Sequence, residues 1–142
     1  MMIESKSVYC EVQDKSSYEE LLINLKSLSR VQVGDKLCAT DQGRFFVKDT
    51  RVLQFLVRWV MGDNRAKMVE MLKNLYTSLN TALFAPESTY SKTEKLKLVH
   101  LVPSVIFGIE NMKSTYQGDK ITQFSLENIV DDFQSILTRW DN

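Results

Sequence analysis

The chain has 142 residues, of which 44% are hydrophobic and 25% charged, a composition typical of one globular domain rather than of a disordered or fibrous protein. Eighteen Lys and Arg residues balance eighteen Asp and Glu residues, so the basic excess of a free-standing nucleic-acid binder is missing. No apolar run reaches the length of a membrane span, and the N-terminus lacks the apolar core of a signal peptide.

The two cysteines, Cys10 and Cys38, have neither the short spacing of a metal site nor the number that a disulfide framework needs. We therefore expect free thiols, and a soluble protein of a reducing compartment without a membrane contact.

The first fifteen residues are expected to form an extended arm, followed by an amphipathic helix. Ser17 and Glu20 have the spacing of a capping box, in which the serine accepts a hydrogen bond from a free N–H of the first turn and the glutamate accepts one from the serine N–H. The pattern ends at residues 29–30. Apolar side chains recur at helical spacing, at Tyr18, Leu21, Leu22, Leu25 and Leu28.

A β-hairpin is predicted after this helix, because the period of the hydrophobic pattern changes between residues 31 and 47. Val31 and Val33 alternate with polar residues, and residues 41–43 include the glycine of a tight turn. Residues 44–47 are the return strand, rich in aromatic and β-branched side chains. A lone hairpin is marginal in water, so it must lie on helices or pair with the N-terminal arm.

Residues 52–61 are predicted to form a second helix that is apolar except at Gln54 and Arg58. Such a helix must be buried over most of its circumference. Gly62 is expected to end it in a left-handed conformation, and Asp63 or Asn64 to cap the next helix directly. The second and third helices would therefore meet in a tight corner.

Three further helices follow in the predicted order. The third carries an apolar row and ends before Pro86, and the fourth runs over residues 92–113, with a kink or break near residues 100–102 because of Pro103. The last begins near Ser125 and has the most regular amphipathic pattern in the chain. The row of the third helix is Met68, Leu72, Leu75, Leu79 and Ala82.

These elements predict a mainly α fold, with a minor β component, in one globular domain over residues 1–142. The expected architecture is a bundle of about five helices, with one β-hairpin inserted between the first and second helices.

Catalytic motifs are missing from the sequence. It has no glycine-rich phosphate loop, and its single histidine, His100, excludes any site that needs two imidazoles. A nucleophilic Cys38 or Cys10 with His100 as the base is formally open, but His100 lies in a leucine- and valine-rich run that is more typical of a structural histidine. We therefore expect no enzyme, no cofactor and no metal site.

The strongest candidate site is a polar group around the predicted corner. Arg51, Gln54 and Arg58 share the only polar stripe of the apolar helix, next to Trp59, and Arg65 follows just past the corner with Asp63. Guanidinium groups suit phosphate or carboxylate, so one interpretation is a site for an anion or an acidic partner. The other is structural: Arg58 and Arg65 pair with Asp63 or with carbonyls of the helix ends and fix the corner.

Short ordered elements resemble a group of uncharacterised proteins of large nucleocytoplasmic DNA viruses. They are, in order, Asn24-Leu25-Lys26-Ser27-Leu28, Gly34-Asp35-Lys36-Leu37, Phe45-Phe46-Val47, Gln54 with Arg58-Trp59, and Gly62-Asp63-Asn64-Arg65, within residues 20–75. The resemblance carries no activity. It implies a viral origin and a multi-copy, virion-associated protein, so we expect the chain in the virion or in the infected-cell cytoplasm.

The function expected from these features is that of a non-enzymatic viral structural or interaction protein, either a minor virion component or a host-factor binder. It would bind a protein partner or itself through Phe45 and Phe46 or through Phe133 and Trp140 of the last helix. No small-molecule substrate is indicated. The alternative is a nucleic-acid-associated protein with a basic face. That face would comprise Arg51, Arg58, Arg65, Lys67 and Lys73.

Overall fold

The computed structural model describes residues 18–39, 45–48 and 65–141, and all statements below concern these residues. They form a helical bundle with a four-helix arrangement. The first helix is described over residues 18–29, and three longer helices follow, α3 (Arg65–Phe84), α4 (Lys92–Thr115) and α5 (Lys120–Asp141). The expected arm, the turn at 41–43 and the apolar helix at 52–61 lie outside the described residues.

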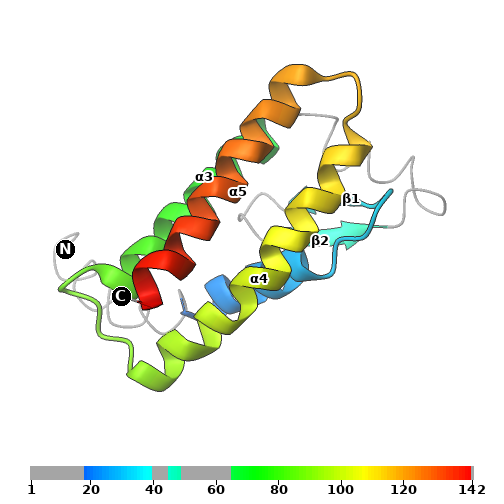
Figure 1. The fold of residues 1–142 in the computed structure, drawn as a ribbon. Helices are drawn as coiled ribbons and strands as arrows, with labels where there is room; N and C mark the ends of the chain where they lie inside the picture. Colours follow the sequence, from blue (N-terminus) through cyan, green and yellow to red (C-terminus); the bar gives the residue numbers. More distant parts are fainter. Residues whose placement is uncertain (1–17, 40–44, 49–64, 142) are drawn as a thin grey trace, which may run out of the picture.

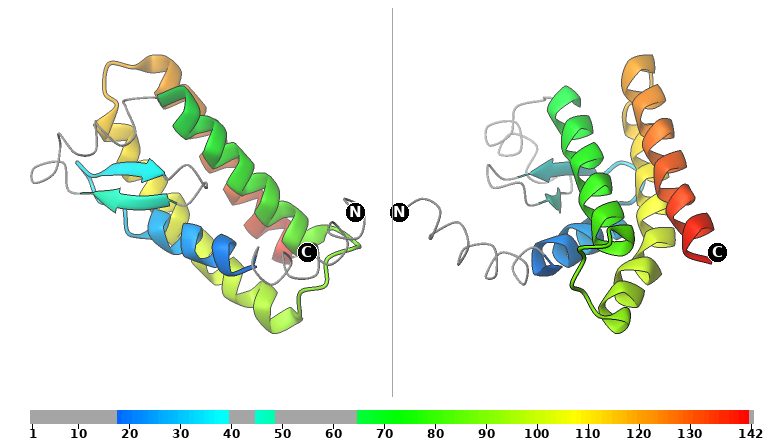
Figure 2. Two further views of the ribbon diagram at one scale, coloured as in Figure 1. Left: turned by 180° about the vertical axis from the view of Figure 1, so that it is seen from behind. Right: turned by 90° about the vertical axis from the view of Figure 1, so that its left-hand side faces the viewer.

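The three long helices lie side by side, and α4 runs antiparallel to α3 and α5 (Figure 1). Helix α5 packs against both α3 and α4, whereas those two contact each other less. Helix 18–29 and two short strands cover the opposite side of α3 and α4, as the view from behind shows (Figure 2). The bundle therefore has α5 on one side and the segment 18–48 on the other.

Strands β1 (Lys36–Ala39) and β2 (Phe45–Lys48) pair antiparallel, with Leu37 opposite Val47. Both strands lie close to the segment, residues 31–47, for which the sequence predicts a β-hairpin. Leu37 and Phe45 are buried, so the pair contributes apolar side chains to the helical core. Strand β1 contacts both α3 and α4, as expected for a ribbon too small to be stable alone.

The apolar rows predicted for the third and last helices are confirmed as the core-facing sides of α3 and α5. Side chains from all four helices meet in one hydrophobic core. Its largest fully buried members are Leu25, Leu28, Leu72, Leu79, Leu98, Ile109, Met112, Leu126, Ile129, Phe133 and Ile136.

Of the kink or break predicted near residues 100–102, a break is wrong, because α4 is one continuous helix from Lys92 to Thr115. Pro103 lies on its exposed face.

The predicted start of the last helix is also wrong, because α5 begins at Lys120 and not near Ser125. Asp119 caps it: one carboxylate oxygen accepts a hydrogen bond from the Thr122 N–H (3.1 Å) and the other accepts one from the Thr122 hydroxyl (2.7 Å). The apolar pattern placed the helix start too late because the apolar residues of the first turn do not face the core. Ile121 and Phe124 point to solvent, with 82% and 65% of their surface exposed.

None of the described helices is both long and apolar enough to cross a membrane.

Candidate functional site

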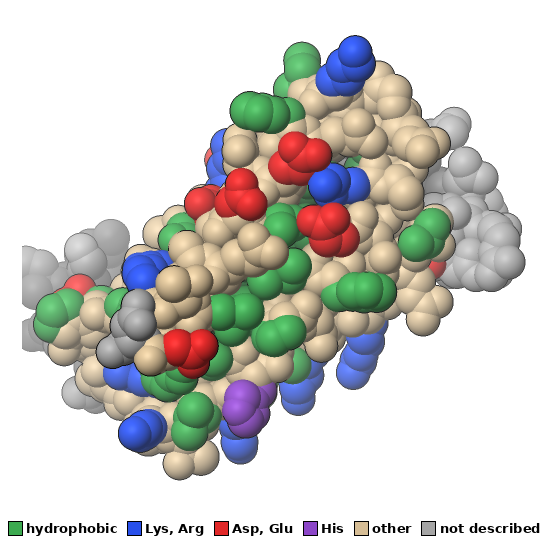
Figure 3. Space-filling model, viewed as in Figure 1, with side chains coloured by type: hydrophobic (Ala, Val, Ile, Leu, Met, Phe, Trp, Pro, Cys, Tyr) green, Lys and Arg blue, Asp and Glu red, His purple; other side chains and the backbone are tan. Residues whose placement is uncertain are grey.

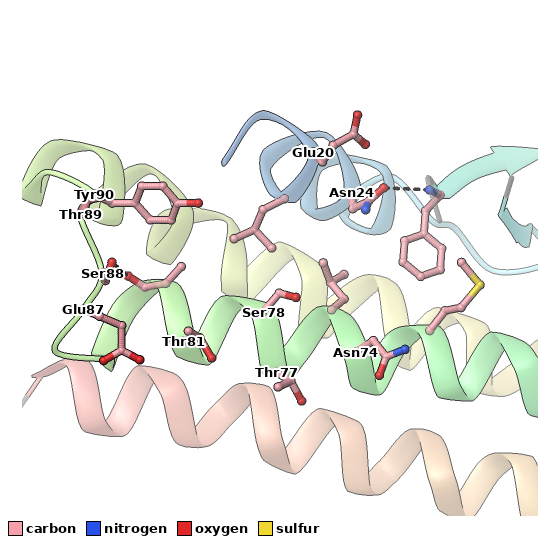
Figure 4. Close-up of a pocket in the computed structure, with 15 residues that line it drawn as sticks. Glu20, Asn24, Asn74, Thr77, Ser78, Thr81, Glu87, Ser88, Thr89 and Tyr90 are labelled. Atoms are coloured by element: carbon pink, nitrogen blue, oxygen red, sulfur yellow. Dashed lines mark hydrogen bonds between the residues drawn. The ribbon is translucent and has the colours of Figure 1, made fainter. Parts of the chain in front are cut away.

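A groove of about 590 Å³ lies between helix 18–29 and α3 and is the candidate site of the described structure. The loop between α3 and α4 closes one end, and strand β2 lies towards the other (Figure 4). The residues that line it are Glu20, Leu21, Asn24, Phe45, Met71, Asn74, Leu75, Thr77, Ser78, Thr81, Ala82, Glu87, Ser88, Thr89 and Tyr90.

The floor of the groove is apolar, whereas its α3 wall carries small polar side chains. Leu21, Phe45, Leu75 and Ala82 are buried and belong to the hydrophobic core. The polar side chains recur at i, i+3, i+4 and i+7, a spacing that places them on one face of the helix. They are Asn74, Thr77, Ser78 and Thr81, and all four are exposed.

The wall formed by helix 18–29 is attached to β2 through a buried amide. The side-chain oxygen of Asn24 accepts a hydrogen bond from the backbone N–H of Phe45 at 2.8 Å, and Asn24 is 8% exposed (Figure 4). This bond satisfies a backbone donor at the beginning of β2 and keeps the Phe45 ring on the floor.

The closed end of the groove is fixed by the caps of two helices. The Ser88 hydroxyl donates to the Ala82 carbonyl at the end of α3 (2.6 Å). Ser91 and Glu94 form a reciprocal capping box at the start of α4. Tyr90 lies in the loop between these two caps. The centre of its ring is 5.2 Å from that of Tyr18, so the loop also packs against helix 18–29.

The charged residues among the described lining of the groove are two glutamates. Glu20 comes from helix 18–29 and Glu87 from the loop after α3, on opposite sides of the groove (Figure 4). No Lys, Arg or His is among the lining residues that the structure describes.

Arg65 lies away from the groove, in a second polar cluster at the start of α3 and α5. Its guanidinium forms an ion pair with Asp119 at 2.9 Å and lies over the Tyr116 ring, 5.0 Å from the ring centre. The Tyr116 hydroxyl in turn donates to the Met68 sulfur (3.4 Å). Arg65 thus connects α3 to the loop before α5.

The pKa of Asp119 is lowered from 3.8 to about 2, first by the hydrogen bond from the Thr122 side chain and then by the one from Arg65. The backbone N–H of Thr122 and the charge of Arg65 lower it further, against a smaller desolvation effect. Asp119 is therefore ionised in its capping role under ordinary conditions.

Of the predicted arginine group, only Arg65 is described, and it forms an ion pair with Asp119. The expected pair of Arg65 with Asp63 involves a residue outside the described part of the chain. The other members lie outside the described residues: Arg51, Gln54, Arg58, Trp59 and Asp63.

The aromatic residues predicted to form an interface have different environments. Phe133 is fully buried and packs edge-on against Tyr76, with 5.7 Å between ring centres, so it serves the core. Phe45 is buried on the groove floor, and Trp140 is partly buried against Phe84. The side chain of Phe46 lies outside the description.

Among the described residues, the fold leaves four large apolar side chains exposed that no sequence pattern identified: Val33, Phe107, Ile121 and Phe124. On the face shown in Figure 3, hydrophobic side chains also reach the surface along the line where α4 and α5 meet. Lys113 of α4 forms ion pairs there with Glu110 (3.5 Å) and with Glu127 of α5 (3.3 Å).

Of the residues considered for catalysis, Cys10 and the side chain of Cys38 lie outside the description. His100 is on an exposed face of α4 and is not among the described residues that line the groove. Within residues 18–39, 45–48 and 65–141, no group of three or more His, Cys, Asp or Glu side chains could hold a metal ion.

No protein-family model matches the chain, and neither a curated protein nor a solved structure is significantly similar to it.

Proposed function

We propose that the protein is a non-enzymatic interaction protein that binds a segment of a protein partner in the groove between helix 18–29 and α3. The observation that carries this proposal is the combination of an apolar floor with a straight row of polar side chains along one wall. The groove volume falls within the range of about 300–1,000 Å³ that is usual for ligand sites.

The row from Asn74 to Thr81 has the right length for a short piece of extended chain. Seven residues of α-helix rise about 10 Å, which three residues of an extended strand also span. Hydroxyl and amide groups both donate and accept hydrogen bonds, so they suit a peptide backbone. The apolar floor would take one or two apolar side chains of the same segment.

We also propose that the protein is of viral origin, as the sequence resemblance implies. The resemblance to proteins of large DNA viruses supports a minor virion component or a host-factor binder, located in the virion or the infected-cell cytoplasm. A five-helix architecture, with the apolar segment 52–61 as the additional helix, is part of the same proposal.

The test is a selection of peptides from a displayed random library on the whole protein, followed by NMR mapping of each binding site. We expect the selected peptides to shift the amide signals of Asn74, Ser78 and Ser88. Ser78→Phe fills the middle of the groove and should abolish binding, whereas Ser104→Phe, at an exposed position of α4 outside the groove, should not. Peptides that bind elsewhere, or that ignore Ser78→Phe, would contradict the proposal.

Self-association is a second form of the same interaction function, and the exposed Phe107, Ile121 and Phe124 favour it. Light scattering behind a sizing column, at low and high salt, measures the mass. A salt-insensitive oligomer that Phe124→Ser dissociates would support contact through α5. A monomer at all concentrations would contradict it.

The alternative is nucleic-acid association through a basic face, supported by the exposed side chains of Lys67 and Lys73 on α3. The pairing of Arg65 with Asp119 weakens it, because that guanidinium already faces a carboxylate. In the same light-scattering experiment, a complex with a short DNA duplex at low salt only would favour this alternative.

A further inference from the structure

We propose that the N-terminal arm of the chain, residues 1–17, occupies the groove between helix 18–29 and α3 and competes there with the partner segment. The arm would turn back along helix 18–29, with residues 12 to 7 following the groove from its closed end towards β2. This inference rests on the proposed function of the same groove and adds its regulation, an internal competitor that a partner must displace.

The arm joins the described structure at the closed end of the groove. Tyr18 is the first described residue, and its buried ring lies against Tyr90, which lines the groove. The Tyr18 hydroxyl also donates to the Glu94 carbonyl in the first turn of α4 (3.3 Å). Helix 18–29 runs from this end towards β2 (Figure 4). The point at which the arm leaves is therefore fixed next to the groove.

The length of the arm suffices to follow the groove. The α3 wall runs from Met71 to Ala82, a rise of about 17 Å at about 1.5 Å per residue. The six residues 7–12 span about 20 Å when extended, at about 3.3 Å per residue. Residues 13–17 remain for the change of direction, and Asp14 and Ser16 are residue types that favour turns.

The pattern of the arm matches the groove. Residues 7–12 alternate between apolar and polar side chains, so their apolar side chains fall on one edge of an extended segment. These are Val8, Cys10 and Val12. That edge would face the apolar floor, where Leu21 and Leu75 are buried. The peptide groups of the arm would then face the exposed hydroxyls and amide of the α3 wall, which both donate and accept hydrogen bonds.

Covalent attachment favours the chain's own arm over the arm of a second copy. A segment joined by a short linker is present at an effective concentration on the order of 1 mM. The arm of another molecule would match that level only in a protein solution of about 1 mM. A weak interaction with the groove is therefore intramolecular, and it lowers the apparent affinity of a partner in proportion to the fraction of grooves that stay free.

Cys10 allows the position of the arm to be measured. A nitroxide on Cys10, in full-length protein with Cys38→Ser so that one thiol remains, broadens the NMR signals of nearby amides. We expect the amide signals of Asn74 and Thr81 to lose most of their intensity, and that of Ile121, at the start of α5, to keep it.

Two controls accompany this measurement. Ser78→Phe fills the groove and should restore the signals of Asn74 and Thr81. A mixture of nitroxide-labelled protein with separate isotope-labelled protein should show no broadening. Broadening in the mixture would place the arm of a second copy in the groove and would overturn the intramolecular arm.

Charge substitutions in the arm test the competition. Val8→Asp puts a charge on the edge that faces the floor, so it should restore the groove signals and strengthen binding of a peptide selected on the groove. An arm that fills about two-thirds of the grooves predicts a gain of about threefold. Ser7→Asp adds the same charge on the opposite edge and should change neither quantity.

The outcomes separate the two proposals. Groove signals that the nitroxide leaves unchanged, with equal peptide affinity in Val8→Asp and the parent, would overturn the docked arm and keep the groove as a partner site. Broadened groove signals that Val8→Asp restores, without any peptide that binds there, would keep the docked arm and overturn the proposed function.

Discussion

Gly108 of α4 faces the carbonyl oxygen of Leu28 with no room for a side chain between them. A Cβ at residue 108 would collide with that oxygen and would lie 3.1 Å from the carbonyl carbon. The last turn of helix 18–29 therefore rests directly on the backbone of α4, and this contact sets the position of one groove wall.

Gly108→Ala should destabilise the protein by about 1–3 kcal/mol, because the colliding atoms belong to the backbone and cannot rotate away. Helix propensity alone predicts the opposite, a gain of about 1 kcal/mol. Denaturant unfolding measures the difference, with the exposed Ser104→Ala of the same helix as the control. A stabilised Gly108→Ala variant would show that helix 18–29 does not approach α4 this closely.

Asn24→Ala should cost about 1–3 kcal/mol, because the Phe45 N–H would lose its acceptor in a buried place. Asn128→Ala, an exposed change on α5, should stay within about 0.5 kcal/mol of the parent. Chemical denaturation of the two variants gives both values. Equal costs would mean that the bond between helix 18–29 and β2 contributes nothing to stability.

Acid should weaken the contact between the starts of α3 and α5. The pKa of Asp119 is lower in the folded protein, about 2, than its ordinary value of 3.8, so the unfolded chain binds this proton more readily. The stabilisation is present above the ordinary aspartate range and is lost as the pH falls towards 2. In Arg65→Gln, the Asp119 pKa should rise towards its ordinary value, as NMR titration of the carboxyl carbon can show.

Arg139→Gln is the control for that titration, since Arg139 bonds to Asn80 (2.6 Å) and not to Asp119. It should leave the Asp119 pKa unchanged. An unchanged value in Arg65→Gln as well would assign the whole shift to Thr122.

Ser91→Ala should destabilise the protein by about 1 kcal/mol, because the Glu94 N–H loses its side-chain acceptor at the start of α4. Ser91→Asp keeps an acceptor oxygen there and should retain most of the stability. Thermal unfolding of both variants distinguishes the loss of the cap from a general effect of substitution. Equal losses in the two variants would contradict the capping role.

The sequence predicted those parts of the fold that depend on local periodicity. The row from Met68 to Ala82 and the pattern from Leu126 to Ile136 are buried as expected, because helical spacing alone determines which side chains share a face. The start of α5 was missed because it depends on a cap at Asp119 and not on apolar residues.

The sequence could not predict contacts between residues far apart in the chain. The Arg65–Asp119 pair joins positions 54 residues apart, and no local pattern identifies Asp119 as a partner of Arg65. The polar row on α3 is visible in the sequence as Asn74, Thr77, Ser78 and Thr81, but it reads as an ordinary solvated face. It becomes the wall of a groove only because helix 18–29 crosses nearby.

Helix α4 holds the segment 18–35 at points spread along most of its length. The Tyr18 hydroxyl donates to the Glu94 carbonyl (3.3 Å), the Asn111 amide donates to the Val31 carbonyl (2.9 Å), and the Thr115 hydroxyl donates to the Asp35 carbonyl (3.2 Å). One groove wall is thus attached to α4, while the other is α3 itself, and α5 packs against both long helices. The width of the groove therefore depends on the spacing between α3 and α4, so substitutions in the core beneath α5 would change the affinity for the proposed partner without contacting it.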